Sequence, residues 1–105
     1  MGKFIKTKIG DFSDNILKEI AKSISDKIHC DRYGSCIHFA ELFVEEVNKI
    51  DKNLLLEFWV IEGYVNWEHG DGIPQQHTWI ELKNGEKIDP TYIQFYGKSS
   101  YINKI

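Results

Sequence analysis

The sequence has no long hydrophobic run, no cluster of basic residues and no repeat, low-complexity stretch or linker. Its longest apolar runs, such as Leu54-Leu55-Leu56, are far too short to span a bilayer, so we expect no membrane partner. The net charge is −3 and the basic residues are scattered, which argues against a nucleic-acid partner. A chain of 105 residues rarely builds two cores, so we expect one domain over residues 1–105.

The start of the chain also lacks the features of a targeting segment. Residues 1–6 contain no apolar core of a secretory signal, and Lys6 stands where a myristoylation motif needs serine or threonine. We therefore expect a cytoplasmic protein. A hydrophobic content of 42% is enough for a packed core, and 13% aromatic residues argue against disorder.

Only two cysteines are present, Cys30 and Cys36. A disulfide closing this short loop suits a secreted protein, whereas a reducing cytoplasm argues against it. A metal site that adds His29 and His38 is the other alternative, but the cysteine spacing is wide for a zinc knuckle and no second ligand pair follows. We expect no metal and no cofactor, and we interpret Cys30 as a small, partly buried residue at a helix end.

Hydrophobic periodicity predicts two helices in the first half of the chain. Residues 12–28 place apolar side chains four apart, with Asp11 or Ser13 as the N-cap. Residues 35–50 repeat the pattern, with Ser35 as the N-cap. The apolar positions are Phe12, Ile16, Leu17, Ile20, Ala21, Ile24 and Ile28, then Phe39, Ala40, Phe43, Val47 and Ile50.

The second half of the chain has the composition of strands. Residues 54–64 and Gln75–Leu82 are rich in apolar and aromatic residues, and residues 92–96 are a candidate for one more strand. Asn84-Gly85 predicts a two-residue hairpin turn of the primed type, so residues 86–89 pair back antiparallel. The predicted fold is α+β, with two N-terminal helices packed on a three- to four-stranded antiparallel sheet.

Three short segments contain the candidate catalytic residues. They are Gly34-Ser35-Cys36, His77-Thr78-Trp79-Ile80-Glu81 and Asp89-Pro90-Thr91. They supply a thiol, an imidazole and a carboxylate, which are the parts of an activated sulfur nucleophile. Cys36 stands at a predicted helix N-terminus, where the helix dipole lowers the pKa of a thiol and free N–H groups can donate to an oxyanion. Each residue alone is more often structural, and the combination indicates a thiol enzyme.

The predicted hairpin brings the imidazole and the carboxylate near one another. With two turn residues, Ile80 faces Asp89, which leaves Asp89 a few residues from alignment with His77. A bulge or a longer loop would bring the two side chains together.

The motif set resembles the transglutaminase-like superfamily of papain-fold thiol enzymes, over about residues 33–95. The resemblance implies that Cys36 is the nucleophile, His77 the general base and acid, and Asp89 the residue that orients the imidazole. It also implies an acyl-thioester intermediate, in a family that includes proteases, transglutaminases, deamidases, peptide N-glycanases and arylamine acyltransferases.

The chain departs from the family pattern at the oxyanion hole, because no Gln or Trp lies upstream of Cys36. Backbone N–H groups, Asn15 or Tyr33 would have to serve instead. The candidates for oxyanion or substrate binding are Tyr33, Ser35, Trp79 and Trp67, the last in a predicted loop over residues 66–74.

The expected function is therefore cleavage or transfer of an acyl group at a peptide or side-chain amide, with a peptide or protein as the substrate. Hydrolysis is favoured. Acyl transfer to an amine and a non-catalytic protein-binding module on the same fold are the alternatives.

Overall fold

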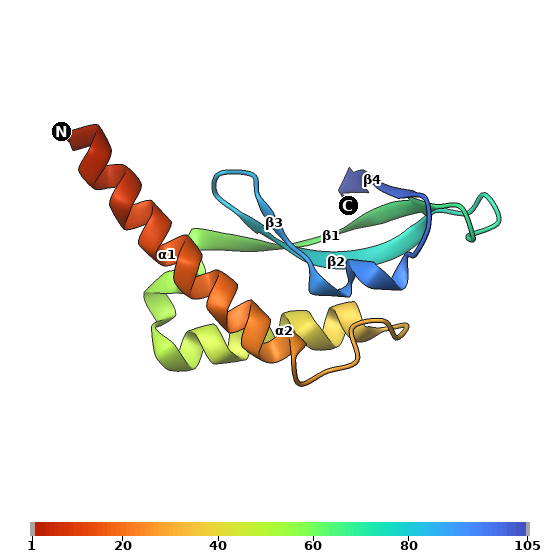
Figure 1. The fold of residues 1–105 in the computed structure, drawn as a ribbon, viewed down its shortest axis with the longest axis horizontal. Coiled ribbons are helices and arrows are strands. Elements are labelled where there is room, and N and C mark those ends of the chain that lie inside the picture. Colours follow the sequence, from red (N-terminus) through yellow and green to blue (C-terminus); the bar gives the residue numbers. More distant parts are fainter. Residues whose placement is uncertain (1, 105) are drawn as a thin grey trace.

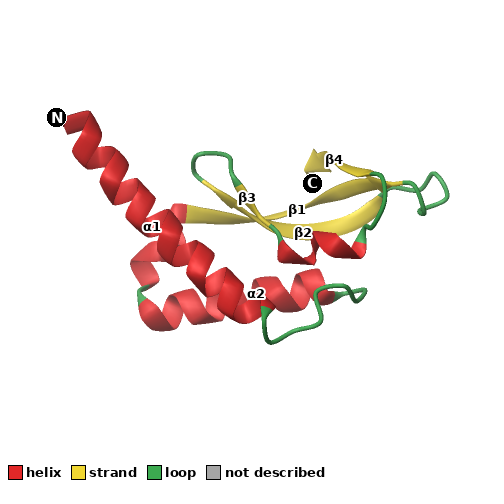
Figure 2. Cartoon of the chain, in the orientation of Figure 1, coloured by secondary structure: helices red, strands yellow, loops and turns green. Residues whose placement is uncertain are grey.

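The computed structural model describes the backbone of residues 2–104 and the side chains of residues 14–102. Two helices precede a curled, four-stranded antiparallel sheet, which confirms the predicted α+β class (Figure 1). The strand order is β3-β2-β1-β4, and the helices lie on one side of the sheet (Figure 2). The elements are α1 (Gly2–Ser25), α2 (Ser35–Ile50), β1 (Phe58–Trp67), β2 (Gln75–Leu82), β3 (Lys87–Ile88) and β4 (Ser99–Lys104).

Helix α1 differs from its predicted bounds at both ends. It runs from Gly2 to Ser25, so Asp11 and Ser13 lie inside the helix and neither caps it. The side chain of Phe12 lies outside the described residues. The predicted apolar stripe of α1 is present from Leu17 to Ile24 and packs into the hydrophobic core. The buried core residues are Leu17, Ile20, Ala21, Ile24, Phe39, Phe43, Val47, Leu54, Phe58, Ile80, Leu82 and Ile88.

Helix α2 begins and ends where the sequence predicts, but Ser35 does not cap it. The N-cap is Gly34, whose φ of 86° is in the left-handed region that glycine tolerates best. The Ser35 hydroxyl is buried and donates to the carbonyl oxygen of Cys30 at 3.0 Å. Ile50, predicted as the last apolar position of the stripe, is 55% exposed.

One predicted strand begins later than expected, and another is absent. Residues Lys52–Glu57 form a 3₁₀ helix, started by the Asp51 side chain, which accepts a hydrogen bond from the Asn53 N–H. Pro90–Gln94 is also a 3₁₀ helix, because proline at its first position pre-sets the helical φ. The fourth strand lies later in the chain, where β4 pairs with β1. Strand β1 continues to Trp67, into the stretch predicted as a loop.

The hairpin between β2 and β3 has a three-residue turn, which corrects the predicted register by one position. The Leu82 N–H donates to the Glu86 carbonyl at 2.8 Å, and Gly85 has a φ of 90°. This is the turn in which a left-handed glycine forms a bulge, and it pairs Ile80 with Ile88. Continued by one residue, the register aligns Asp89 with Trp79. Because side chains alternate, Asp89 then shares a face with His77.

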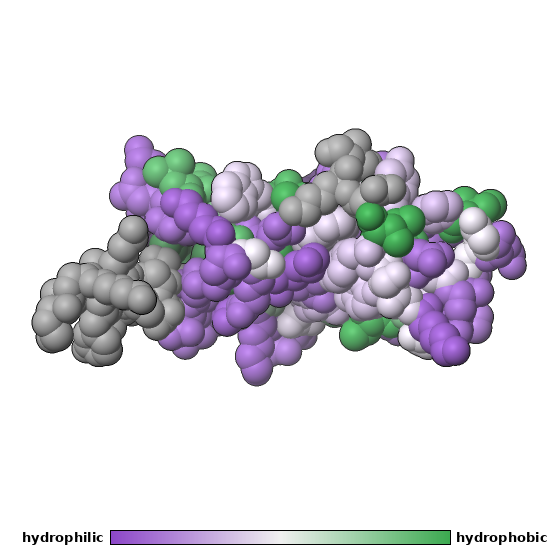
Figure 3. All heavy atoms as spheres, turned by 90° about the horizontal axis from the view of Figure 1, so that it is seen from above, coloured by the Kyte–Doolittle hydropathy of each residue, from purple (hydrophilic) through white to green (hydrophobic). Residues whose placement is uncertain are grey.

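Within residues 2–104, no helix has the length and apolar character needed to cross a lipid bilayer. On the face seen in Figure 3, hydrophobic residues form small separate patches among hydrophilic ones.

Candidate functional site

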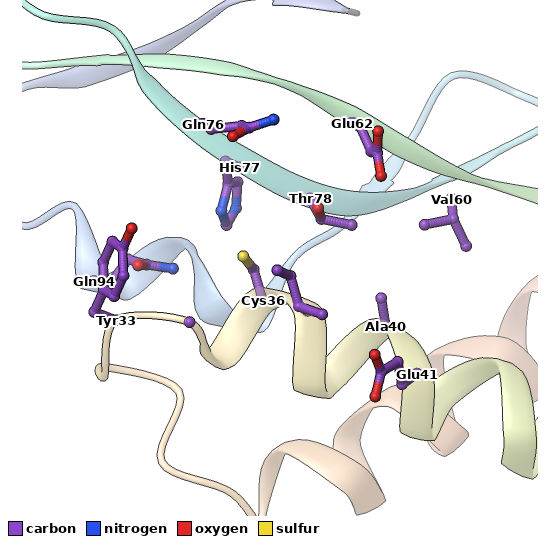
Figure 4. Close-up of a pocket in the computed structure, with 12 residues that line it drawn as sticks. Tyr33, Cys36, Ala40, Glu41, Val60, Glu62, Gln76, His77, Thr78 and Gln94 are labelled. Carbon is purple, nitrogen blue, oxygen red and sulfur yellow. The ribbon is translucent and has the colours of Figure 1, made fainter.

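Three elements bring the predicted thiol, imidazole and carboxylate together. Cys36 lies in the first turn of α2, His77 lies on β2, and Asp89 directly follows β3. The His77 Nε2 and Asp89 Oδ2 atoms are 2.7 Å apart, so the predicted contact is present. The Cys36 sulfur points toward the His77 ring from the other side (Figure 4). The imidazole therefore lies between the thiol and the carboxylate.

The His77 side chain is completely buried. Its Nδ1 atom is also buried and makes no hydrogen bond to any described nitrogen or oxygen atom. The group that faces Nδ1 is the Cys36 thiol, with which the ring interacts. Since Asp89 accepts from Nε2–H, Nδ1 is left to exchange a proton with sulfur.

The interactions of Cys36 and His77 favour a thiolate beside an imidazolium. Burial by itself raises the pKa of Cys36, but hydrogen bonds from His77 and from the Thr78 N–H outweigh it, so the pKa lies below its ordinary value. Burial by itself lowers the pKa of His77, but Asp89 and Cys36 outweigh it and raise the pKa to about 9. Neutral pH falls below the pKa of this imidazole, where it stays protonated and favours the thiolate.

Asp89 is held by two further side chains. The Tyr101 hydroxyl donates to Oδ2 at 2.6 Å, and the Thr91 hydroxyl donates to Oδ1 at 3.1 Å. Burial and the adjacent Asp89 carboxylate raise the pKa of Tyr101, which keeps its hydroxyl protonated as a donor. Sequence reasoning missed Tyr101, because its position depends on the pairing of β4 with β1.

Aromatic rings enclose the imidazole on the sides away from sulfur. Trp79 stacks on His77 with ring centres 5.9 Å apart, and Phe95 meets it edge-on at 5.0 Å. Trp79 is almost fully buried and donates from Nε1 to Glu81. It packs against the imidazole and is not among the residues that line the cavity at Cys36.

A cavity of about 400 Å³ opens onto Cys36 and His77. Of the other predicted binding residues, Tyr33 lines it and Ser35 does not, because the Ser35 hydroxyl is used inside the adjoining loop. Trp67 lines a neighbouring cavity, with its Nε1 donating to the Tyr96 carbonyl at 2.7 Å. The lining residues are Tyr33, Gly34, Cys36, Ile37, Ala40, Glu41, Val60, Glu62, Gln76, His77, Thr78 and Gln94.

Hydrogen-bond donors for an oxyanion are available around the sulfur. The backbone N–H groups of Ile37 and Thr78 both reach Cys36. Two amide side chains, Gln76 and Gln94, line the same cavity, and both follow Cys36 in the sequence. Asn15 lies on α1 and is not among the residues lining the cavity.

Cys30 differs chemically from Cys36, and both are free thiols. Cys30 is buried in the loop after α1, not at the helix end, and its sulfur lies 3.7 Å from the Ser25 carbonyl oxygen. Burial and the nearby Asp31 carboxylate raise its pKa. Among the described residues, no group of three or more His, Cys, Asp or Glu side chains is placed to hold a metal ion.

The chain matches no protein-family model, no curated protein and no solved structure. Any function assigned to this site is therefore argued from its own residues and geometry.

Proposed function

We propose that the chain is a cysteine-nucleophile enzyme that hydrolyses a peptide or side-chain amide through a thioester at Cys36. The observation that carries the proposal is the placement of His77 between the Cys36 thiol and the Asp89 carboxylate at the wall of an open cavity. This is the arrangement of nucleophile, base and orienting acid that such chemistry needs. The resemblance of the three motifs to the transglutaminase-like superfamily supports the same reaction class.

In the first half of the reaction, the Cys36 thiolate attacks the amide carbonyl carbon. The carbonyl π electrons move to oxygen, and the Ile37 and Thr78 N–H groups, which reach the Cys36 sulfur, donate hydrogen bonds to this oxyanion. As the tetrahedral intermediate collapses, the C–N bond breaks and the His77 imidazolium gives its proton to the departing amine. A thioester and a neutral imidazole remain.

In the second half, His77 takes a proton from water while the water oxygen attacks the thioester carbon. The C–S bond then breaks, the acid leaves, and the thiolate–imidazolium pair is restored. An amine in place of water would give acyl transfer by the same steps. The proposal assumes a reducing compartment such as the cytoplasm, where a thiol nucleophile stays reduced.

The test is turnover of peptide and glutamine-amide substrates, followed by mass spectrometry. Asp89→Asn should lower turnover on the order of a hundredfold or more, because an amide can hold the wrong imidazole tautomer and cannot stabilise the imidazolium. Cys36→Ser should lower turnover further, because a hydroxyl is a poorer nucleophile in a site tuned for thiolate.

Circular dichroism controls for folding in both variants. Substrate turnover that persists unchanged in folded Cys36→Ser and Asp89→Asn would place the chemistry elsewhere in the chain. Stable binding of a peptide without turnover in the wild type would favour the protein-binding alternative.

A further inference from the structure

The cavity at Cys36 is the middle of a longer groove. A second cavity of about 400 Å³ adjoins it along α2 and shares Ala40, Glu41 and Val60 with it. A third cavity, of about 230 Å³, adjoins the other end and shares Tyr33, Gln76 and Gln94. Because they share these residues, the three cavities adjoin one another on both sides of the sulfur, and we call them together the groove. An elongated groove suits an extended peptide.

The charged side chains of this groove, apart from His77, are all acidic. Glu41 and Glu62 line the central cavity, Glu45 lines the second and Asp31 the third, and no Lys or Arg lines any of the three. Glu45 is paired with Lys49 at 3.2 Å. Within the described residues, neither Glu41 nor Glu62 has an ion-pair partner or a side-chain hydrogen bond.

Glu41 and Glu62 lie on the same side of the nucleophile. Figure 4 shows both on the side of Cys36 away from Tyr33, with Ala40 between them and Val60 farther from Cys36. Glu41 follows Cys36 by five positions on α2, roughly 7.5 Å along the helix axis. Glu62 pairs in register with Thr78, whose N–H reaches the sulfur. Two carboxylates therefore flank a short apolar floor.

A second observation indicates where a substrate carbonyl would lie. The fully buried His77 side chain also lines this cavity, and its Nδ1 atom, which bonds no described nitrogen or oxygen atom, faces the Cys36 sulfur that would attack a carbonyl carbon. An extended peptide advances about 3.4 Å per residue, so roughly 7.5 Å along α2 corresponds to about two residues. Aliphatic stems of Lys and Arg lie well on apolar surface while their heads meet carboxylates.

We propose that the groove selects acyl donors with a Lys or Arg side chain about two residues from the attacked carbonyl. The stem lies over Ala40 and Val60, and the cationic head lies between Glu41 and Glu62. This inference rests on the proposed function, and it concerns the acyl donor and not an acceptor amine.

Thiol-reactive peptides test the inference without a known substrate. In one set, an iodoacetyl group is attached to the N-terminus of Gly-Lys-amide, Gly-Glu-amide or Gly-Gln-amide. In the other set, a chloromethyl ketone forms the C-terminus of acetyl-Lys-Gly, acetyl-Glu-Gly or acetyl-Gln-Gly. In both sets the Cys36 sulfur displaces halide, and the tail extends in opposite directions along the groove. Labelling rates of Cys36 are measured by mass spectrometry, with plain iodoacetamide as the reference reagent.

The Lys probe should label Cys36 about tenfold faster than the Glu probe in at least one orientation, with the Gln probe between them. The difference should shrink with added salt, because the carboxylates are exposed to solvent. Glu41→Gln/Glu62→Gln should reduce it to within about twofold. Glu19→Gln/Glu46→Gln, which changes net charge equally on exposed helix positions outside the groove, should preserve it.

The inference would be overturned if the Lys and Glu probes labelled Cys36 at equal rates in both orientations while iodoacetamide labelled it fast. That result would leave the proposed function standing. A preference that survives Glu41→Gln/Glu62→Gln, or that is lost in Glu19→Gln/Glu46→Gln, would also overturn it. Slow iodoacetamide labelling of Cys36 together with no amide turnover would instead count against the proposed function.

Discussion

The Asp89 carboxylate accepts three hydrogen bonds at the site. Its Oδ2 atom lies 2.7 Å from His77 Nε2 and 2.6 Å from the Tyr101 hydroxyl, and Oδ1 accepts from Thr91. Three donors on one carboxylate leave it little freedom to rotate. Tyr101 is therefore a positioning residue that acts on the imidazole through Asp89.

Tyr101→Phe removes one of these donors and leaves the ring. We expect kcat to fall about tenfold with KM nearly unchanged, because the imidazole is held less firmly in the transition state. The expected stability cost is about 1–2 kcal/mol. Steady-state kinetics and thermal unfolding measure the two effects separately.

Tyr92→Phe is the matched control. Its hydroxyl accepts from the Ser99 hydroxyl at 2.8 Å, on a ring that packs beside Tyr101. The Tyr92→Phe variant should lose about as much stability as Tyr101→Phe and should retain the wild-type kcat. An equal loss of kcat in both variants would mean that Tyr101 acts only through the packing of these rings.

The two thiols should differ in reactivity, since burial raises the pKa of Cys30 whereas His77 holds that of Cys36 below its usual value. At pH 7, iodoacetamide should alkylate Cys36 much faster than Cys30, and His77→Ala should abolish the difference. Peptide mapping by mass spectrometry reads both sites in one sample. Equal rates in the wild type would make Cys36 a structural thiol.

The same pair sets the pH dependence of turnover. Activity should appear as pH rises through the lowered pKa of the Cys36 thiol, and it should fall as pH rises through the His77 pKa of about 9, where the proton for the leaving amine is lost. The profile of kcat/KM against pH shows both limbs, which belong to the coupled pair. A profile that still rises above pH 10 would contradict the assignment of His77 as the acid.

Among the elements, the hairpin between β2 and β3 decides which face Asp89 occupies. A two-residue turn would align Asp89 with Ile80, on the core face, whereas the observed three-residue turn aligns it with Trp79. Gly85 makes this turn with a φ of 90°. The geometry of the candidate site thus depends on a glycine that touches neither the thiol nor the imidazole.

Gly85→Ala should destabilise the protein by about 1 kcal/mol or more, because alanine is strained at positive φ. Turnover should fall as well, since the register of Asp89 is loosened. Lys83→Ala in the same turn removes only an exposed ion pair with Glu57 and serves as the control. Thermal unfolding followed by circular dichroism measures the change. Equal stability of Gly85→Ala and wild type would mean that the turn adopts another conformation in solution.

The sequence predicted the elements whose signals are local. The bounds of α2 and β2 follow from periodicity and composition, and the order of Cys36, His77 and Asp89 follows from short motifs. The predictions are wrong where a contact between distant parts of the chain, or the length of a turn, determines the local structure. Strand β4 forms because β1 offers it an edge, and the turn length depends on one backbone angle. Glu41 and Glu62 line one cavity only because α2 packs against the sheet, so no local pattern joins them.

On the scale of the whole molecule, one hydrophobic core joins both helices to the sheet. Phe43 lies near its centre, fully buried, with its ring 5.0 Å from that of Phe58. Residues from α1, α2, β1, β2 and β3 all belong to this core. We therefore expect the chain to unfold as one cooperative unit, as a single domain does.

Phe43→Ala should cost about 3–5 kcal/mol, a large part of the 5–15 kcal/mol typical of a small domain. The midpoint of thermal unfolding should fall by more than about 10 °C. Ile50→Ala, at a position that is 55% exposed, is the control and should change little. Near- and far-ultraviolet circular dichroism should report the same transition in all three proteins. Two separate transitions in the wild type would show that the helices and the sheet unfold independently.

The burial of the His77 ring has a consequence for the order of events in catalysis. Aromatic rings and Asp89 pack against the imidazole, and the ring also lines the cavity at Cys36. In the proposed reaction, the departing amine and the incoming water would both pass through this cavity. The amine product would then leave through the same entrance before water reaches the thioester.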